Sequence, residues 1–337
     1  MENEILVSVV VPVYNTERYL SRCMDALVSQ TLDKKSLEIV IVNDGSTDSS
    51  PEIIESYRCK YPELIKVYNK SNGGQASARN LGIKKATGRY IGFADSDDYV
   101  DHSLFKKLSD KAISENADLT ECHYHSMLEQ EKTDDDGLPT YKEIGTRGTI
   151  KAHDDVKELF LNPQVSPWNK LYKREIIIDN NIFFPEGMIY EDTAFYLKTL
   201  PYINKQAYVD EKLVYYCVRN NSTMTGNLGI KVGDIFKVFD DIIEFFLRNK
   251  LFSKYKDELE YFCVKTAFCS NISRIGRVEQ AGIRSELYDK TFDFVRKHFP
   301  YYKKNKYFNG KIGMYIRSVN RLTCQVYGRI LAKVMVG

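Results

Sequence analysis

The first hundred residues alternate short apolar runs with longer stretches of helical periodicity, and this alternation constrains the fold more than any other feature. The runs are rich in Val and Ile, as expected of strands buried on both faces of a parallel sheet. The stretches between them carry apolar residues three or four positions apart, as helices do. Strands that alternate with helices predict a mostly parallel sheet with helical crossovers. The predicted strands are residues 7–13, 37–42, 64–68 and 90–94.

The rest of the chain is less regular. A helix is predicted up to Glu115, followed by an alternating strand over 117–124. Residues 127–150 are polar and contain several glycines, which predicts a mobile or inserted loop. From about Lys231 the periodicity is helical almost to the end. Further sheet and helix are predicted over 168–178 and 207–218.

Length and composition are those of an ordinary globular protein. With 337 residues, 43% hydrophobic and 28% charged, the chain can bury a large core in one domain or in one domain with an appendage. Its seven cysteines form no Cys-x-x-Cys pair, so neither a disulfide framework nor a zinc site is indicated. No apolar run approaches the roughly 20 residues that span a bilayer, and the acidic start is unlike a signal peptide. We therefore expect a cytosolic protein.

Three carboxylates directly follow the fourth predicted strand. Asp95, Asp97 and Asp98 stand at its carboxyl end, the edge where open α/β sheets bind their ligands. Carboxylate oxygens suit Mg²⁺ or Mn²⁺ together with the phosphate oxygens of a bound anion. Asp98 is expected to cap the next helix. A second acidic run, Asp134–Asp136, follows no such strand and is interpreted as a solvated loop.

Six strings of residues occur in an order that carries a family resemblance: Val9–Asn15, Ile41–Asp48, Asn72–Gly82, Ala94–Asp98, Trp168–Leu171 and Glu191–Asp192. Over roughly residues 5–225 the chain resembles the inverting glycosyltransferases of family 2. The resemblance implies an α/β fold of the GT-A type, a Rossmann-like and mostly parallel sheet flanked by helices. It also implies a nucleoside-diphosphate sugar donor and a Mn²⁺ or Mg²⁺ ion.

The predicted organisation has two parts. We expect a GT-A catalytic domain over 1–228, with a nucleotide-sugar half over about 1–100 and an acceptor half over about 101–228. A helical region with a basic amphipathic tail is expected over 229–337. No internal repeat is present.

The turns after the first two strands are candidates for binding the base of the donor. Asp44 could accept the imide hydrogen of a uracil, since a carboxylate accepts but cannot donate. The alternative is an Asx cap for the helix that starts near Ser49. Tyr14 could stack on the base or be an ordinary packing tyrosine. Pro12 and Asn15 would shape the same pocket.

The sugar and phosphates would meet the next two strings. Gly73–Gly74 lets the backbone pass close to a ligand, and Arg79 can present a planar cationic fork to the nucleotide. A solvent-exposed helix arginine is the alternative. The resemblance implies that Asp97 ligates the metal and that Asp95 meets the ribose or the metal shell. Asn72 and Ser96 complete the predicted donor-binding residues on these strings.

Inverting transfer needs a base on the face of the sugar opposite the leaving diphosphate. The resemblance assigns this role to Asp192, after the turn Phe184–Gly187. Glu191 could orient the acceptor or be the base itself. The alternative is a pair of acidic residues that stabilises a helix amino terminus over 193–200 through the macrodipole.

Three further residues complete the predicted site. Trp168, the only tryptophan, and Lys170 could form a platform and a charge beside the sugar, or Trp168 could be a buried anchor. Arg219, with Ser222 and Thr223, resembles a late family string that closes over the diphosphate. His123 and His125 share a strand face without a third metal donor nearby, so they are interpreted as structural.

The predicted function is inverting, metal-dependent hexosyl transfer from a UDP-sugar to a glycan or lipid-linked acceptor in surface polysaccharide synthesis, such as capsule or exopolysaccharide. UDP is favoured as the nucleotide only because it is common in the family that the chain resembles. The rival is a catalytically silent module that binds nucleotide sugar or glycan, which a donor-hydrolysis assay would distinguish. A dinucleotide oxidoreductase is disfavoured because no GxGxxG string follows the first strand. The sequence leaves the sugar, the acceptor and the oligomeric state open.

The carboxyl-terminal segment is strongly basic. From Phe294 to Gly337 there are ten Lys or Arg residues and no Asp or Glu. Between Lys311 and Val334 apolar residues recur three or four apart, which predicts an amphipathic basic helix. Two interpretations stay open: contact of residues 296–337 with the inner face of the cell membrane, or packing against the body or a twin chain. No nucleic-acid motif is present.

Overall fold

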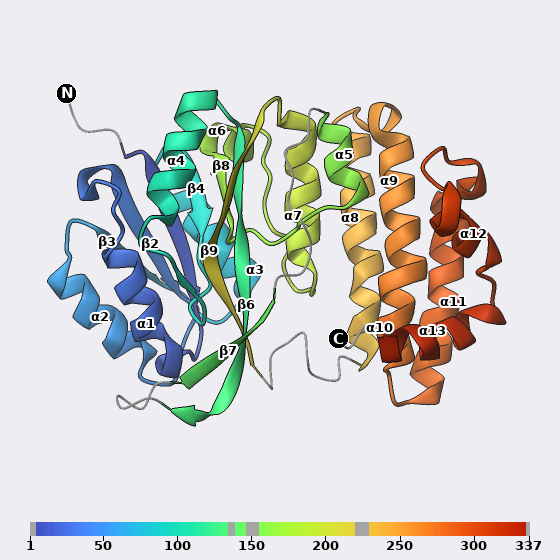
Figure 1. Ribbon diagram of the computed structural model, residues 1–337, viewed down its shortest axis with the longest axis horizontal. Helices are drawn as coiled ribbons and strands as arrows, with labels where there is room; N and C mark the ends of the chain where they lie inside the picture. Colours follow the sequence, from blue (N-terminus) through green and yellow to red (C-terminus); the bar gives the residue numbers. More distant parts are fainter. Residues whose placement is uncertain (1–4, 134–138, 146–154, 220–228, 335–337) are drawn as a thin grey trace. The chain divides into compact units, whose positions relative to one another are not determined.

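The computed structural model describes residues 5–133, 139–145, 155–219 and 229–334. The chain divides into two compact units (Figure 1). The first, here called the sheet unit, comprises Met1–Val156, Gln164–Gly187 and Tyr202–Asn220. The second, the helical unit, comprises Lys157–Pro163, Met188–Pro201 and Asn221–Gly337. Two short segments of the helical unit therefore interrupt the sheet unit in the sequence.

The first half of the sheet unit has the predicted alternation of strands and helices. The strands β1, β2, β3 and β4 pair in parallel in the order β3-β2-β1-β4. All seven residues of β1 are buried, which agrees with a sequence that is apolar except for Ser8. In chain order the elements are β1 (Val7–Val13), α1 (Glu17–Val28), β2 (Leu37–Asn43), α2 (Ser50–Lys60), β3 (Ile65–Asn69), α3 (Gln75–Lys85) and β4 (Tyr90–Phe93).

The two faces of β1 pack against different helices. Val9 and Val11 belong to the core cluster that contains Leu20 and Met24 of α1. Val10, on the other face, lies against α3, where Gly82 leaves room for it. Side chains that alternate between the faces of a strand thus place helices on both sides of the sheet.

Replacement of Gly82 by alanine is expected to destabilise the sheet unit. An added Cβ would lie 2.2 Å from Cγ1 of Val10, and overpacking of this kind costs about 1–3 kcal/mol. The midpoint of thermal unfolding should fall for Gly82→Ala and recover in part when Val10→Ala is added. Gly282→Ala is the control, because a Cβ there meets nothing within 4 Å. An unchanged midpoint for Gly82→Ala would contradict the close packing of α3 on β1.

The second half of the sheet is mixed. The full order is β3-β2-β1-β4-β8-β6-β9-β5, with β7 paired to β6. β8 is antiparallel to both β4 and β6, whereas β9 is parallel to β6. The added elements are β5 (Tyr99–Val100), α4 (Leu104–Glu115), β6 (Leu119–Thr133), β7 (Pro139–Gly145), β8 (Lys170–Lys173), α6 (Arg174–Asp179) and β9 (Gln206–Val218).

The loop predicted over 127–150 is wrong for the part that the structure describes. β6 continues to Thr133, and β7 runs back antiparallel to it. Met127 and Leu128 also pair with Cys217 and Val218 of β9. Up to Leu128 the backbone of β6 pairs with β9, and from Ser126 to Thr133 it pairs with β7, so the strand persists through a polar sequence. The acidic run Asp134–Asp136 lies outside the described residues.

The helical unit has a core of its own, rich in phenylalanine. Phe239 of α8 contacts Phe236, Phe262 and Phe294, with ring centroids 5.3–6.2 Å apart. The predicted change to helical periodicity after Lys231 is confirmed. The helices are α5 (Val156–Leu161), α7 (Glu191–Thr199), α8 (Asp234–Arg248), α9 (Phe252–Thr266), α10 (Ile272–Gly276), α11 (Ala281–His298), α12 (Gly310–Ser318) and α13 (Thr323–Val334), with a π-helical turn at Ala267–Asn271.

The amphipathic helix predicted over 311–334 is two helices. α12 ends at Ser318 and α13 begins at Thr323. Between them the side-chain Oδ1 of Asn320 accepts hydrogen bonds from the backbone N–H groups of Leu322 and Thr323. The Oγ1 of Thr323 accepts in return from the backbone N–H of Asn320. This reciprocal cap starts a new helix, which apolar periodicity alone does not reveal. No helix among the described residues has the length and apolarity needed to cross a membrane.

Candidate active site

Five of the predicted donor-site residues follow β1, β2 and β4: Tyr14, Asn15, Asp44, Asp95 and Ser96. These parallel strands end at the same edge of the sheet, where open α/β sheets bind ligands. The turns Tyr14–Thr16, Asp44–Asp48 and Ala94–Asp98 are joined by hydrogen bonds. Asn15 accepts through Oδ1 from the backbone N–H of Thr47 at 2.8 Å, and Thr16 Oγ1 donates to Ser96 Oγ at 3.1 Å.

The carboxylates after β4 are held by arginines from two distant parts of the sequence. Asp95 Oδ1 accepts from Nη2 of Arg79 at 2.7 Å and from Nε2 of Gln75 at 3.1 Å. Asp97 forms an ion pair with Arg219, which directly follows β9. The two carboxylates predicted to address one ligand thus each have a cationic partner.

The acidic cluster contains more carboxyl groups than arginines. Burial raises the pKa of the Asp97 carboxyl, and the charge of Asp95 raises it further, while Arg219 acts in the opposite direction. Burial and then the charges of Asp97 and Asp95 raise the pKa of Asp98 well above its ordinary range. Three ionised carboxylates against Arg79 and Arg219 would leave one net negative charge, a setting that favours a further cation.

Asp98 does not cap a helix, contrary to the prediction. Its Oδ1 accepts from the backbone N–H of Cys217 on β9 at 2.7 Å. Its Oδ2 is buried and has no hydrogen-bond partner among the described residues. At the start of α4 it is Asp101 that accepts, from the backbone N–H and the hydroxyl of Ser103. The sequence did not reveal this because β9 lies more than one hundred residues away.

The cluster fits a divalent cation that takes only part of its coordination from the protein. Among the described residues, no three His, Cys, Asp or Glu side chains are grouped to hold a metal. Mg²⁺ in particular keeps several waters and is held by one or two carboxylates together with phosphate oxygens. Asp95 and Asp97 supply that number, and the third carboxyl group, Asp98, has an oxygen without a hydrogen-bond partner among the described residues.

Asp44 organises the loop before α3. Its carboxylate accepts from the backbone N–H groups of Gly73 and Gly74 at 3.0 and 2.8 Å and pairs with Nζ of Lys70 at 2.6 Å. It does not cap α2, because Asp48 accepts from the backbone N–H of Ser50 instead. The Asx-cap alternative is therefore wrong, and recognition of uracil by Asp44 stays a prediction.

The other residues predicted to bind the base differ in exposure. Tyr14 is 48% exposed, so its ring is open to solvent rather than packed in the core. Asn15 has a left-handed backbone with φ of 50°, a conformation that asparagine tolerates. Asn72 is exposed, whereas Pro12 is buried in β1 opposite Val42. These positions agree with a base near Tyr14, which stays a prediction.

Arg79 is a buried residue, so the alternative of a solvent-exposed helix arginine is wrong. Only 1% of it is exposed, and its guanidinium carbon lies 5.2 Å from the ring centroid of Phe184. The next residue, Asn80, exchanges hydrogen bonds of 2.9 Å with the backbone of Phe184 and donates to Glu186. α3 therefore positions both an arginine of the acidic cluster and the turn Phe184–Gly187.

Trp168 and Lys170 are both buried in the sheet unit. Trp168 stacks on Tyr216 at 5.5 Å between ring centroids and meets Tyr124 edge-on, so it anchors the packing of β6 and β9. Lys170 donates to Ser166 and Asn169 and lies 3.3 Å from the carboxylate of Glu121. The structure supports the buried-anchor interpretation of Trp168, and a contact of either side chain with a sugar stays a prediction.

Two smaller predictions concern histidines and the segment after β9. His123 and His125 lie near single carboxylates, those of Asp210 and Glu143, as expected for structural residues. The guanidinium carbon of Arg219 lies 5.1 Å from the ring centroid of Tyr19. Ser222 and Thr223 lie outside the described residues.

Glu191 and Asp192 belong to the helical unit rather than the sheet unit. They are the first two residues of α7, preceded by Tyr190 with a left-handed φ of 69°. Both side chains are half-buried. Their place in the first helical turn agrees with stabilisation by the macrodipole and equally leaves a carboxylate for proton transfer, so both interpretations remain open.

Two side chains of the site were missed as individual candidates. Gln75 binds Asp95, and Lys70 binds Asp44. Gln75 stands within the string Asn72–Gly82, so its position was the available signal. Lys70 follows β3 without a motif, and only pairing of β2 with β3 brings it to Asp44.

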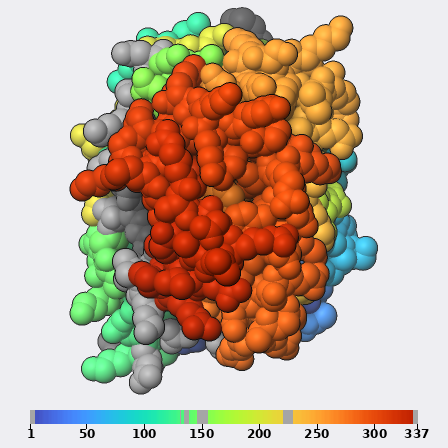
Figure 2. Space-filling view, turned by 90° about the vertical axis from the view of Figure 1, so that its right-hand side faces the viewer, coloured from blue at the N-terminus to red at the C-terminus, as the bar shows by residue number. Residues whose placement is uncertain are grey.

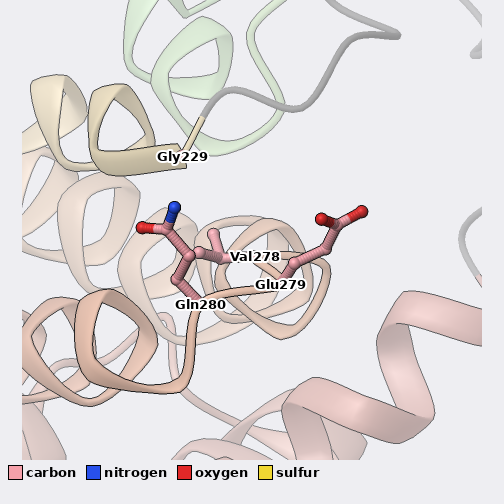
Figure 3. A pocket seen from close by; sticks show the side chains of 4 residues that line it. All are labelled: Gly229, Val278, Glu279 and Gln280. Carbon is pink, nitrogen blue, oxygen red and sulfur yellow. The ribbon is translucent and has the colours of Figure 1, made fainter.

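A separate hollow of about 200 Å³ lies in the helical unit (Figure 3). It is lined by Gly229, Val278, Glu279 and Gln280. The side chains of Glu279 and Gln280 point in different directions and do not converge on a common point. The hollow contains none of the predicted site residues and has no arrangement suited to catalysis.

Comparisons with known proteins agree with the resemblance. A family model described as Glycosyl transferase family 2 matches residues 8–179, about half of the chain. EpsH of Bacillus subtilis (strain 168) is 31% identical over 289 residues, which cover 84% of this chain and 80% of EpsH. EpsJ of the same strain, described as an uncharacterized glycosyltransferase, is 35% identical over 224 residues. These cover 64% of this chain and 62% of EpsJ, so the chain matches less than two thirds of that relative.

A solved structure shares the fold. Staphylococcus aureus TarS 1–349, in complex with UDP-GlcNAc, matches with a TM-score of 0.75 and 21% identity. The match covers 98% of this chain and 92% of that one. The predicted α/β fold of the GT-A type with a helical carboxyl-terminal region is thereby confirmed.

Proposed function

The chain belongs to glycosyl transferase family 2, and from this premise we propose that it moves a sugar from a nucleoside-diphosphate donor to a hydroxyl group of a glycan or lipid-linked acceptor. The observation that carries the proposal is the acidic cluster after β4, with Asp95 and Asp97 held by Arg79 and Arg219. The structure of TarS, which is similar in fold, is a complex with UDP-GlcNAc, and this supports a UDP-sugar as the donor. TarS is described as a poly(ribitol-phosphate) β-N-acetylglucosaminyltransferase, and this supports a role in bacterial surface polysaccharide synthesis.

The proposed donor site uses the chemistry of the cluster. Asp97 and Asp95 would hold Mn²⁺ or Mg²⁺, which neutralises the diphosphate and stabilises the charge that develops there. Arg79 and Arg219 are planar cations suited to phosphate oxygens, and both already lie at the cluster. The ordered loop of Asp44, Gly73 and Gly74 would meet the nucleotide, with Tyr14 against the base.

The proposed reaction inverts the anomeric carbon. Asp192 takes the proton of the acceptor hydroxyl, and the acceptor oxygen bonds to the anomeric carbon from the face opposite the diphosphate. The bond from that carbon to the diphosphate oxygen breaks, and its electron pair leaves with the diphosphate. Glu191 would orient the acceptor. Only four residues separate Asp192 from Gly187, the end of the turn that Asn80 holds.

We assign donor binding and catalysis to residues 1–228 and place the reaction in the cytoplasm, at the inner face of the cell membrane. A lipid-linked acceptor would be presented there. The helical region over 229–337 follows the catalytic part and contributes its basic carboxyl-terminal segment.

UDP-sugars are expected to stabilise the protein in the presence of Mn²⁺. A donor at one hundred times its Kd stabilises the fold by about 2.7 kcal/mol, because it binds only the folded state. The thermal unfolding midpoint should rise by several degrees with a UDP-sugar, and less with the same sugar as a GDP derivative. A panel of UDP-sugars would also identify the transferred sugar.

The outcome distinguishes the function from its rival. Absence of a shift with every nucleotide sugar would contradict a donor site. A shift without any release of UDP, across acceptors that relatives of this family use, would favour a silent binding module.

A further inference from the structure

The last helix, α13, packs closely against the helical unit along one side. Cys324 and Gly328 are buried on this side. A Cβ at Gly276 of α10 would lie 2.3 Å from the carbonyl oxygen of Gly328, and a Cβ at Gly328 would lie 2.1 Å from the hydroxyl of Tyr288. The backbones of α10 and α13 thus approach as closely as glycines allow, and this side of α13 has its packing partner.

The opposite side of α13 is also apolar, but it is exposed. Leu322, in the turn directly before α13, and Val326 and Ile330 of α13 are 85%, 55% and 53% exposed, and the spacing of four residues puts Val326 and Ile330 on one side of the helix. Arg329 lies on the same side and is exposed. In Figure 2 the C-terminal helices, in red, form much of the face toward the viewer. We call Val326, Arg329 and Ile330, together with Leu322 directly before the helix, the outer face of α13.

A surface helix normally carries one apolar stripe, directed at the core. α13 carries two, and the second has no packing partner among the described residues. The two interpretations of the predicted apolar stripe, packing against the protein and contact with the membrane, thus concern different residues. Ile316 and Val319 of the predicted stripe are buried, whereas Leu322, Val326 and Ile330 are not.

The net charge of the segment that carries the outer face favours an anionic partner over a second copy of the chain. Within this segment Arg321 pairs with Asp289 and Asp293 of α11, and Lys306 pairs with Asp257 of α9. The segment from Phe294 to Gly337 contains ten Lys or Arg residues and no acid. Two copies that met through this face would bring their basic segments together, and the stripe from Leu322 to Ile330 is only about 12 Å long. A stable dimer needs about 800 Å² from each partner, more than three aliphatic side chains supply.

We infer that the outer face of α13 docks on the surface of an anionic lipid bilayer. Leu322, Val326 and Ile330 enter the boundary between headgroups and acyl chains, and Arg329 meets the lipid phosphates. Lys303, Lys304 and Lys311, which form no ion pair within the described part of the chain, add attraction to the anionic surface. The inference stands on α13 itself and does not depend on the transfer reaction.

Vesicle flotation tests the inference with matched variants. The full-length protein should float with vesicles of phosphatidylcholine containing 30% phosphatidylglycerol and not with phosphatidylcholine alone. Leu322→Gln with Ile330→Gln should weaken binding at least tenfold, because both side chains leave water on docking. The control is Leu247→Gln with Ile230→Gln, which removes one leucine and one isoleucine, 57% and 47% exposed, elsewhere in the helical unit. It should bind as the wild type does.

A second variant and a second measurement complete the test. Arg329→Gln should weaken binding and reduce its dependence on salt, since one lipid contact is lost. All variants change exposed side chains, so equal unfolding midpoints would show that folding is intact. Binding that is equal in the Leu322/Ile330 variant and the wild type, or absent in both, would overturn the inference. So would a dimer in light scattering that the Leu322/Ile330 variant alone disrupts, since a second copy would then cover the outer face.

Discussion

Asp192→Asn is expected to lower the turnover number of sugar transfer by a factor of about 10² to 10⁴ while donor affinity stays within a factor of three of the wild type. A general base contributes a rate factor of this size, and an amide cannot accept the proton of the acceptor hydroxyl at neutral pH. Turnover would be measured as UDP release with donor and acceptor in excess. Donor affinity would be measured by calorimetry.

Glu191→Gln is the matched variant, because it removes the same charge from the same first turn of α7. Loss of either charge should cost about 0.3–1 kcal/mol through the helix macrodipole, so the unfolding midpoints of the two variants should be similar. Turnover should remain measurable in Glu191→Gln. The reverse pattern would make Glu191 the base, and a joint loss of folding and donor binding in Asp192→Asn would assign Asp192 a structural role.

Asp97→Asn is expected to abolish the effect of Mn²⁺ on donor binding. A metal that neutralises the diphosphate is worth several kcal/mol, so the affinity for the UDP-sugar with Mn²⁺ should fall about 10²-fold. Without metal, the variant and the wild type should bind the donor with similar affinity. Calorimetry with and without Mn²⁺ measures both quantities, and the electron spin resonance of free Mn²⁺ reports metal binding independently of activity.

Asp110→Asn is the control for Asp97→Asn. Asp110 is an exposed residue of α4 that pairs with Lys106, so its loss should leave metal and donor binding unchanged. If Mn²⁺ raised the donor affinity of Asp97→Asn as much as that of the wild type, the metal would have other ligands. The acidic cluster would then bind the donor by another route.

The predictable part of the fold rests on local patterns. The strands β1, β2 and β4 were predictable because residues buried on both faces leave nearly continuous apolar runs. The hairpin of β6 and β7 was not, because its polar side chains show no period. It is held by backbone pairing of β7 with β6 and of β6 with β9. The break between α12 and α13 was hidden for a similar reason, since the cap at Asn320 depends on a few hydrogen bonds rather than on hydrophobicity.

The candidate site also has a part that the sequence predicts and a part that it does not. The cluster around Asp95 could be located because a motif follows a strand, and burial of Arg79 agrees with a role there. The partners of Asp97 and Asp98 could not be predicted, because Arg219 and Cys217 come from β9 and its end, far along the sequence. Pairing across a sheet creates such contacts, and a single sequence carries no record of which strands become neighbours.

One short helix fixes the options for redesigning the donor preference of this protein. Within α3, Arg79 binds Asp95, Asn80 forms hydrogen bonds with the turn Phe184–Gly187, and Gly82 packs closely against Val10 of β1. Rotation or sliding of this helix would disturb all three contacts at once, so α3 acts as a rigid scaffold for the site. Mutant libraries aimed at new sugars or nucleotides should therefore leave residues 79–82 unchanged. They should diversify solvent-exposed positions such as Tyr14 and Asn72, where substitution leaves the contacts of α3 intact.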